Sequence, residues 1–361
     1  MYTFLTHIVF LPFLIALIST ILLTPLCIYL LKINRIVDDP KTHKHPAILH
    51  TKPIPRGGGI PIFLGIFIAG LTFLPITNTT IALFISSLLA LITGVADDKF
   101  DISPYIRFCV NIICAIIVVS SGVTISFVTN PLGGILHFGN LFFIPQFLNQ
   151  YAWILPYVIA IVWIVWVMNM LNWSKGVDGQ MPGIVAISAI IIGIVSLRFP
   201  ISDQNTYIAA LLSFMIAGAS IGFLFFNFYP AKIFPGYGAT GIYLLLATVS
   251  ILSSAKLATA LLVMGVPMID GMFTILRRIL SGRSPFWHDK KHLHHILLQF
   301  GFSQRTIALF YWMLSAILGV LSLSLSSRGK VFALIMILLI IGGSLLSLHF
   351  ALKARNEKET F

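Results

Sequence analysis

Residues 8–30 read IVFLPFLIALISTILLTPLCIYL and carry no charged side chain. About 20 predominantly apolar residues are enough for a helix to cross the hydrocarbon core of a bilayer. The chain has ten more such runs, at 59–74, 80–95, 105–128, 151–168, 182–197, 207–226, 240–252, 257–273, 306–323 and 331–352. The sequence therefore predicts an all-α, polytopic integral membrane protein with about eleven transmembrane helices. The count is ten if the weakest run, 240–252, pairs with its neighbour as a re-entrant segment.

The composition excludes several other classes of protein. Of the 361 residues, 58% are hydrophobic and 9% are charged, whereas about 25% of the residues of a soluble domain are charged. The apolar runs do not alternate as the strands of an outer-membrane barrel would. All three cysteines lie inside apolar runs, which argues against a disulfide framework or a zinc site. No internal repeat divides the chain, so we expect one transmembrane domain over residues 1–361.

The basic residues predict the orientation of the chain. The net charge is +12, and 19 of the 23 lysines and arginines fall on one alternating set of loops when Arg107, just inside a span end, is counted with that set. By the positive-inside rule this set is cytoplasmic, so we expect the N-terminus outside and the C-terminus in the cytoplasm. No basic run is interleaved with stacking aromatic residues, so we expect no nucleic-acid partner. The predicted cytoplasmic loops are 31–58, 96–104, 169–181, 227–239 and 274–305, followed by the C-terminal tail.

The acidic residues and the histidines gather on the same face of the membrane. Ten of the eleven acidic residues, all except Asp203, and seven of the ten histidines fall there. The positive-inside rule does not depend on acidic residues, so their placement needs another reason. One face therefore carries nearly every group able to bind a metal, transfer a proton or hold a phosphate.

The second predicted loop begins with two adjacent carboxylates, Asp97 and Asp98. Two such groups repel each other at a bilayer surface unless a cation lies between them. Mg²⁺ prefers one or two carboxylates together with substrate phosphates and waters. The pair is therefore a candidate metal and phosphate site, although a solvated helix end would also explain it.

The third loop combines paired amides with a tightly held carboxylate. Asn169 and Asn172 are three residues apart and so lie on one helix face. Amides without hydrogen-bond partners at a membrane boundary would be costly. Gly176 and Gly179 flank Asp178 in a turn that can aim its carboxylate. We expect this loop to bind substrate.

The first loop contains the polar residues Lys44, His50 and Arg56. They are suited to phosphate oxygens, and equally to anionic lipid headgroups. The prolines and glycines around them indicate an ordered loop.

The fifth loop combines Arg278 and other cations with His292, His294 and His295, and the fourth loop adds Asn227. The histidine spacing does not fit a zinc site well. Imidazoles that donate hydrogen bonds and arginines that bind bidentately suit a diphosphate better.

In this order the motifs resemble those of the polyprenyl-phosphate N-acetylhexosamine-1-phosphate transferases, the glycosyltransferase 4 type that includes MraY, WecA and TagO. The resemblance covers nearly the whole chain, and the last motif is closer to the WecA and TagO branch. The matching motifs are Asp38-x-Pro40 with Lys44, His50-x-x-Pro53-x-Pro55-Arg56-x-Gly58, Asp97-Asp98, Asn169-x-x-Asn172 with Gly176-x-Asp178-Gly179, Phe226-Asn227 with Pro230-Ala231 and Phe234-x-Gly236, and Ser284-Pro285-Phe286 with Asp289 and His292-x-His294-His295.

The resemblance implies a reaction, a cofactor and a location. A UDP-N-acetylhexosamine, with GlcNAc as the first candidate, would give its sugar-1-phosphate to undecaprenyl phosphate and release UMP, with Mg²⁺ as cofactor and Mn²⁺ as the alternative. The enzyme would lie in the lipid bilayer of the bacterial inner (cytoplasmic) membrane, with its active site on the cytoplasmic face. It would serve cell-envelope synthesis, such as that of lipopolysaccharide or teichoic acid, and a homodimer is possible.

The resemblance also implies roles for individual residues. Metal binding falls to Asp97, Asp98 and Asp178, and catalysis to these three with His294 and His295. Substrate binding falls to Lys44, His50, Arg56, Asn169, Asn172, Lys175, Asn227, Arg278 and His292. A lipid phosphate is largely dianionic at neutral pH, which favours its direct attack without a strong base. A carboxylate acting as a covalent nucleophile stays open.

Two positions depart from the family pattern. Lys175 stands where the family usually has Asp, and Tyr237 where it usually has a metal-binding Asp. Either Lys175 supplies positive charge directly, or Asp178 holds the metal with the Asp97–Asp98 pair. A catalytically impaired homologue that binds polyprenyl phosphate or a nucleotide-sugar as a scaffold is the alternative function. A transporter is less favoured, because His349 is the one clear ionisable candidate within a predicted span.

Overall fold

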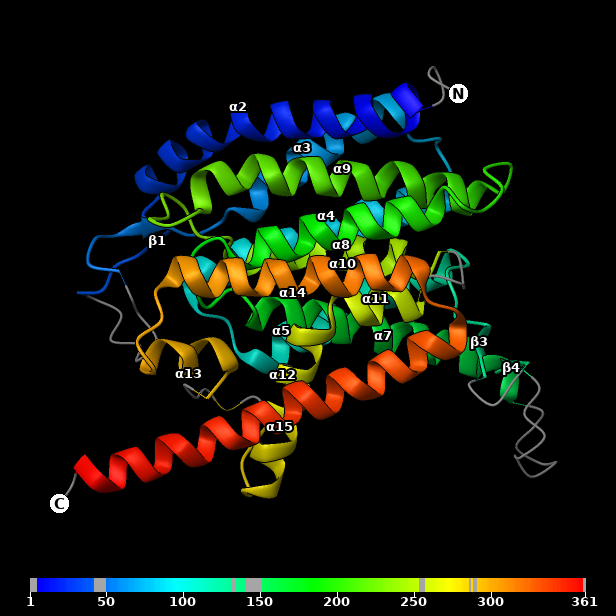
Figure 1. The fold of residues 1–361 in the computed structure, drawn as a ribbon. Coiled ribbons are helices and arrows are strands. Elements are labelled where there is room, and N and C mark those ends of the chain that lie inside the picture. The colour runs from blue at the N-terminus through cyan, green and yellow to red at the C-terminus, as the bar shows by residue number, and fades with distance from the viewer. Residues whose placement is uncertain are drawn as a thin grey trace.

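Figure 1 shows a bundle of helices in the computed structural model, which describes residues 5–41, 50–130, 134–139, 151–252, 257–285, 287 and 291–359. The α-helices of this part are α2 (Leu11–Ile33), α3 (Gly59–Phe73), α4 (Asn78–Phe100), α5 (Pro104–Ser120), α7 (Leu155–Trp173), α8 (Gln180–Ser196), α9 (Gln204–Asn227), α10 (Thr240–Val249), α11 (Leu257–Val263), α12 (Gly265–Leu280), α13 (Leu293–Gln299), α14 (Gln304–Ser324) and α15 (Ser327–Glu359). The short turns are η1 (Thr6–Phe10), η2 (Ala152–Ile154) and η3 (Tyr237–Ala239). The strands are β1 (Val37–Asp38), β2 (Ile54–Pro55), β3 (Phe127–Thr129) and β4 (Ile135–His137), which pair as two antiparallel hairpins. The predicted helical fold class is confirmed.

The long helices support a multi-pass membrane protein. Six described helices are long and apolar enough to cross a membrane, and the count is seven if α11 and α12 form one span. Four shorter helices are also apolar, but the 15 residues of α3 extend only about 22 Å. In Figure 1, α2 begins at one end of the bundle and α15 finishes at the other. The count of eleven spans and the sidedness of the termini stay predictions.

The predicted run 257–273 is two helices and not one straight span. The axes of α11 and α12 differ by 79°. Pro267 lacks an N–H and its ring clashes with the carbonyl four residues earlier, which is that of Val263 at the end of α11. The chain therefore bends before α12, so the two helices form either a broken span or a re-entrant segment, and their count as one span stays a prediction.

Helix α9 lies at the centre of the bundle and is buried along most of its length. Gly218 and Gly222 lie one turn apart on its α2-facing side. A Cβ at Gly222 would lie 2.7 Å from the carbonyl oxygen of Leu17, and one at Gly218 would collide with the carbonyl of Phe13. Small residues at this spacing allow two helix backbones to approach closely. The contact holds α9 in place, and with it the polar residues at its end.

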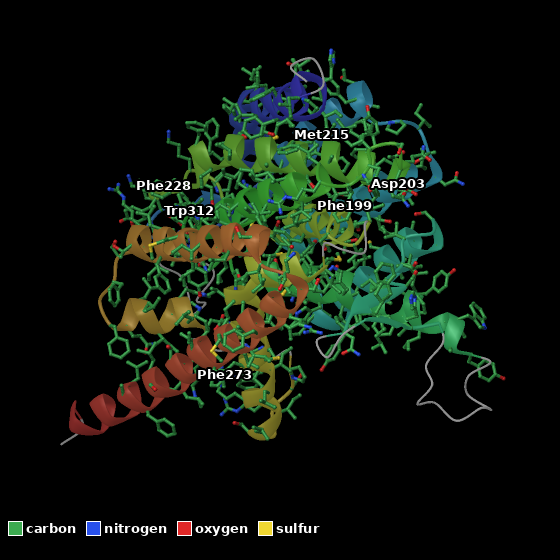
Figure 2. The ribbon with its side chains drawn as sticks, turned by 45° about the vertical axis from the view of Figure 1, so that its right-hand side comes forward. Phe199, Asp203, Met215, Phe228, Phe273 and Trp312 are labelled. Carbon is green, nitrogen blue, oxygen red and sulfur yellow. The ribbon has the colours of Figure 1, made fainter. Side chains whose placement is uncertain are left out.

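The two ends of α9 mark the two ends of the molecule (Figure 2). Asp203 caps the start of α9 by accepting a hydrogen bond from the Thr206 backbone N–H at 2.8 Å. Phe228 follows the other end, and its ring packs on Trp312 of α14 with 5.6 Å between centroids. The predicted catalytic loops lie at the Phe228 end, so Asp203 is far from them.

Local signals bring these loops together. Helix α4 stops because Asp101 adopts a left-handed conformation with φ 50°, and Pro104 then begins α5. Strands β1 and β2 pair Val37 with Pro55. The Phe234 N–H donates to the Pro55 carbonyl at 2.8 Å. The first and fourth loops are therefore joined over the end of the bundle.

Candidate active site

A cavity of about 980 Å³ opens among the polar loops. Its volume falls within the range of small-molecule sites. Of the predicted site residues, those that line it are His50, Arg56, Asp97, Asp98, Asn169, Asn172, Lys175, Asp178, Arg278, His292, His294 and His295. Asn227 supports the adjacent turn, as described below, and Lys44 lies outside the described residues. The structure thus brings the predicted residues together, while their roles stay predictions.

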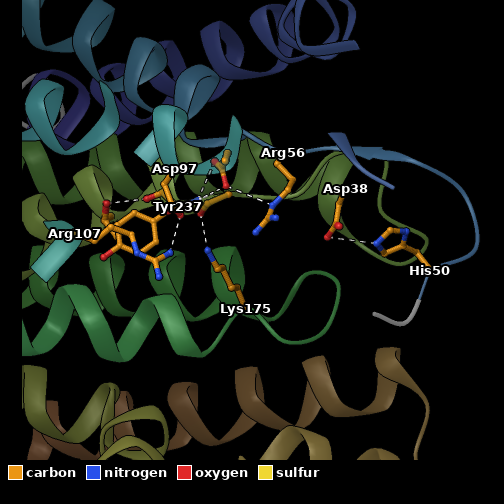
Figure 3. Close-up of polar contacts among 10 residues, drawn as sticks. Asp38, His50, Arg56, Asp97, Arg107, Lys175 and Tyr237 are labelled. Atoms are coloured by element: carbon orange, nitrogen blue, oxygen red, sulfur yellow. Dashed lines mark hydrogen bonds and ion pairs between the residues drawn. The ribbon is translucent and has the colours of Figure 1, made fainter. Parts of the chain in front are cut away.

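Asp97 and Asp98 occupy the last turns of α4 and are buried. Asp97 accepts a hydrogen bond from the Arg107 guanidinium at 2.8 Å, and its Oδ1 is buried without a partner. Both oxygens of Asp98 accept from the Tyr237 backbone N–H at 3.0 Å. The Nε atom of Arg56 lies 3.5 Å from Asp98 Oδ1. Each carboxylate therefore faces its own arginine (Figure 3).

Lys175 and Tyr237 meet beside this pair. The ammonium of Lys175 donates to the Gly236 carbonyl at 2.9 Å and lies 5.6 Å from the centre of the Tyr237 ring. Burial lowers the pKa of Lys175 to about 8, although the nearby Asp98 opposes this shift. The Tyr237 hydroxyl accepts from the Asn111 amide at 3.2 Å. Lys175 and Tyr237, the two residues expected to depart from the family pattern, therefore lie together beside Asp98.

Asp178 lies in the turn before α8, where Gly179 adopts φ +77°. Its carboxylate accepts from the Ala231 N–H at 2.9 Å, which ties the third loop to the fourth. Burial raises the pKa of Asp178, and the Ala231 hydrogen bond opposes the shift. Asn227 accepts from the Gly179 N–H at 3.1 Å and donates to the Ile233 carbonyl at 2.9 Å. Asn227 is thus a buried brace of this turn, and its predicted contact with substrate stays a prediction.

The three histidines lie together at the start of α13. The rings of His292 and His294 are parallel with 5.6 Å between centroids, and His295 lies 4.2 Å from His294. Asp270 of α12 contacts Nδ1 of His292 at 2.9 Å and accepts from the Leu293 N–H at 2.9 Å. Since an ionised carboxylate can only accept hydrogen bonds, Nδ1 of His292 carries the proton. Asp270 therefore sets the tautomer and the direction of His292.

His294 is held against the third loop. A Cβ at Gly176 would lie 2.7 Å from its Cε1 atom and closer to its Nε2 atom, so only glycine leaves room for this imidazole. Burial is the first cause that lowers the pKa of His294 well below its usual value, and the neighbouring histidines add to it. His294 is therefore neutral at neutral pH.

Three further predicted residues, Asn169, Asn172 and Arg278, also line the cavity. Asn169 donates to the Val165 carbonyl at 2.8 Å. Asn172 differs from it, because its Oδ1 is buried without a partner. The guanidinium of Arg278 donates to the Pro285 carbonyl at 2.6 Å and is buried.

His50 of the first loop lies at the open side of the cavity. Its Nε2 is 3.6 Å from a carboxylate oxygen of Asp38, and its ring packs edge-on against Phe234. His50 is therefore ordered by the β1–β2 hairpin and the fourth loop together (Figure 3).

The carboxylates do not form one shared metal site. Among the described residues, no group of three His, Cys, Asp or Glu side chains is arranged to hold a metal ion. Asp98 and Asp178 each accept a hydrogen bond from a backbone N–H, and Asp97 accepts one from Arg107. The residues therefore do not fit the predicted ligand set of Asp97, Asp98 and Asp178 acting together. Magnesium use stays a prediction.

Sequence reasoning missed two residues of this site. Arg107 interrupts an otherwise apolar run just after Pro104, and such a cation needs a partner in a membrane protein. Asp270 likewise interrupts the run 257–273. An isolated charge in an apolar run is visible in the sequence, but the sequence does not show that Arg107 pairs with Asp97 or that Asp270 pairs with His292.

Helices long and apolar enough to cross a membrane, with a polar cavity of carboxylates, cations and imidazoles at one end of the bundle, are typical of a membrane enzyme. The profile of glycosyl transferase family 4 matches residues 80–254. A Bacillus subtilis (strain 168) protein named probable undecaprenyl-phosphate N-acetylglucosaminyl 1-phosphate transferase is 30% identical over 340 residues, covering 91% of this chain and 88% of that protein.

Two further relatives agree. The decaprenyl-phosphate N-acetylglucosaminephosphotransferase of Mycobacterium leprae is 34% identical over 295 residues, covering 73% of this chain and 71% of that protein. The undecaprenyl-phosphate alpha-N-acetylglucosaminyl 1-phosphate transferase of Salmonella typhi is 30% identical over 323 residues, covering 84% and 81%. The chain belongs to glycosyl transferase family 4 and is a glycosylphosphotransferase of the polyprenyl-phosphate type.

Proposed function

We propose that this protein transfers N-acetylglucosamine-1-phosphate from UDP-N-acetylglucosamine to undecaprenyl phosphate and releases UMP. The observation that supports this most is the single cavity, which gathers carboxylates, cations and imidazoles from all five polar loops. One substrate is soluble and the other is a lipid, and a cavity at the helix ends of a membrane protein allows them to meet. The named activities of the relatives point to the same pair of substrates.

The donor fits the cationic side of the cavity. Arg56, Arg107 and Lys175 provide positive charge beside the paired aspartates. The amide oxygen of Asn172 is buried without a partner and is free to accept a hydrogen bond from the donor. The imidazoles of His292 and His294 lie across the cavity and are suited to hydrogen-bonding the second phosphate or the sugar.

The lipid acceptor fits the side of the cavity formed by α12. Its buried face carries Asp270, Thr274 and Arg278, whereas Met272, Leu276 and Ile279 are exposed. A helix with one apolar exposed face and one polar buried face suits a boundary between lipid and a polar site. A prenyl chain beside α12 would place its phosphate at the cavity.

The chemistry needs positioning and charge neutralisation more than a strong base. An oxygen of the dianionic lipid phosphate attacks the phosphorus that bears the sugar, and the bond to UMP breaks with its electron pair leaving on UMP. The cations neutralise charge that builds up on the phosphoryl oxygens. Asp98 is engaged by Tyr237 and Arg56, which favours direct attack over a covalent Asp98 intermediate.

The proposal also covers the location of the enzyme, the use of its product, its metal ion and its oligomeric state. The site would face the cytoplasm of a bacterial inner membrane, and the product would enter cell-envelope polysaccharide synthesis. Mg²⁺ or Mn²⁺ would act, if used, through the unpartnered Oδ1 of Asp97 and the substrate phosphates. A homodimer stays a prediction.

The proposal is tested with purified protein, undecaprenyl phosphate and a panel of radiolabelled UDP-sugars, in Mg²⁺, in Mn²⁺ and in chelator. UDP-N-acetylglucosamine should label the lipid fastest. Asp98→Asn should lower the rate at least about 100-fold, because it removes a charge that orders Arg56 and Tyr237 at the reacting centre. Asp203→Asn is the matched control, since it makes the same change at the far end of α9 and asparagine also caps helices well.

The outcomes separate the proposal from its rivals. Binding of UDP-N-acetylglucosamine with no transfer to lipid under any condition would favour the scaffold function. Faster transfer from a different UDP-sugar would correct the substrate alone.

A further inference from the structure

Three cations converge on the paired aspartates, and we call Arg56, Arg107 and Lys175 the triple-cation cluster. Arg56 comes from the first loop, Arg107 from the first turn of α5 just after the second loop, and Lys175 from the third loop. Arg107 binds Asp97 at 2.8 Å, Arg56 lies 3.5 Å from Asp98, and Lys175 has electrostatic contact with both aspartates. All three line the main cavity (Figure 3).

Tyr237 is the platform that places two of these cations. The Arg107 guanidinium lies 4.8 Å from the centre of its ring, and the Lys175 ammonium 5.6 Å. Tyr237 is held at two points: its hydroxyl accepts a hydrogen bond from the Asn111 amide, and its backbone N–H donates to Asp98. Cations over an aromatic face gain from the ring quadrupole. An aspartate at position 237 would supply none of this support.

The charges of this group favour an anion over a further cation. The triple-cation cluster contributes three positive charges against the two negative charges of Asp97 and Asp98, which leaves a surplus of one. A divalent cation placed here would be repelled by three fixed cations and attracted by two carboxylates that are already engaged. A diphosphate would instead neutralise the surplus, and its oxygens suit arginine and lysine donors.

We propose that the triple-cation cluster, with Lys175 at its centre, holds the diphosphate of the sugar nucleotide directly, so that donor binding needs no divalent cation. The inference rests on the proposed function for the identity of the donor. It explains the two departures from the family pattern together: Lys175 supplies the charge, and Tyr237 holds Lys175 and Arg107 in place.

The test measures binding by isothermal titration calorimetry, with the full-length protein in detergent and with EDTA or MgCl₂ in the buffer. The probes are UDP-N-acetylglucosamine and inorganic pyrophosphate. The wild type should bind both probes in EDTA, and Mg²⁺ should change the affinity for UDP-N-acetylglucosamine by less than about twofold. Lys175→Gln should weaken binding in EDTA by about 10-fold to 100-fold, because a hydrogen bond to a charged group is lost.

Further variants keep the test decisive. Lys175→Arg preserves the charge and should bind within about fivefold of the wild type. Lys175→Asp should bind poorly in EDTA and recover in Mg²⁺. Lys41→Gln is the control, because it removes the same charge from the first loop and does not line the cavity. If Lys175→Gln fails to fold, the binding of UDP-N-acetylglucosamine to the wild type in EDTA and in Mg²⁺ still shows whether donor binding needs a divalent cation.

Two results would overturn the inference. One is a wild type that binds neither probe in EDTA. The other is a Lys175→Gln protein that is folded and binds as tightly as the wild type. If pyrophosphate binds in a Lys175-dependent way while UDP-N-acetylglucosamine does not bind at all, the cation site stands and the proposed donor is wrong.

Discussion

Replacing Gly176 with alanine should disable the site while leaving the fold intact. The new Cβ would lie 2.7 Å from Cε1 of His294 and nearer to Nε2. Ordinary carbon contacts begin at 3.4 Å, so the ring must move by at least the difference, about 0.7 Å, and more to clear Nε2. His294 is buried, its ring is stacked on that of His292 and the tilted ring of His295 also contacts it, so it cannot turn away freely.

A displacement of about 1 Å at a reacting centre costs about 100-fold in rate. We therefore expect Gly176→Ala to lower the transfer of sugar phosphate to undecaprenyl phosphate by about 10-fold to 100-fold, with overpacking costing about 1–3 kcal/mol of stability. The assay is initial-rate lipid labelling at saturating UDP-N-acetylglucosamine, with thermal unfolding followed in the same detergent. Gly343→Ala is the matched control, because nothing lies within 4 Å of its Cβ position in α15.

The reasoning is refuted if Gly176→Ala is folded and its rate stays within about twofold of that of Gly343→Ala. Such a result would mean that His294 has no defined position during the reaction.

Three other changes test separate parts of the site. Asp270→Asn presents an amide N–H to His292 Nδ1 and so reverses the tautomer of His292. We expect the rate of sugar-phosphate transfer to be about 10-fold to 100-fold lower, with an unchanged melting temperature. An unchanged rate would refute the role of Asp270 in positioning His292. Because Lys175 loses its proton near pH 8, binding of UDP-N-acetylglucosamine in EDTA should be strongest below that pH and fall as the pH rises through it. Lys175→Arg should remove this fall between pH 7 and about 9. Asn227→Ala leaves two buried backbone groups, of Gly179 and Ile233, without their partner; we expect a loss of about 2–3 kcal/mol in the free energy of unfolding, measured by thermal denaturation, and an unchanged melting temperature would contradict it.

Much of the site was predictable because polar residues are rare in this chain. With 9% charged residues, each carboxylate or imidazole between apolar runs stands out. Of the predicted site residues that the structure describes, all except Asn227 line one cavity. Asn227 was assigned to substrate because its side-chain type suits that role. The structure shows that its side chain hydrogen-bonds to the backbone of Gly179 and of Ile233, a structural role that the side-chain type did not predict.

Pairings between distant residues were not predictable from spacing. Asp98 and Tyr237 are 139 positions apart, and Asp270 of α12 and His292, next to the start of α13, are 22 positions apart. Nothing in the local pattern of either residue selects its partner. Proline chemistry could have predicted the bend near Pro267. The residues around it are apolar, however, so hydropathy alone indicated one span over 257–273.

The amino-acid sequence alone determined that this is a helical membrane protein, and that its ionisable groups lie at the ends of helices on one face. Apolar runs and scarce charges are local properties, and the bilayer acts on each run separately. Only the tertiary structure decided which charge neutralises which: Arg107 on Asp97, Arg56 on Asp98, and Lys175 over Tyr237. Those choices depend on how the ends of separate helices are brought together, and close packing of the bundle, such as that of α2 on α9 at Gly218, sets those positions.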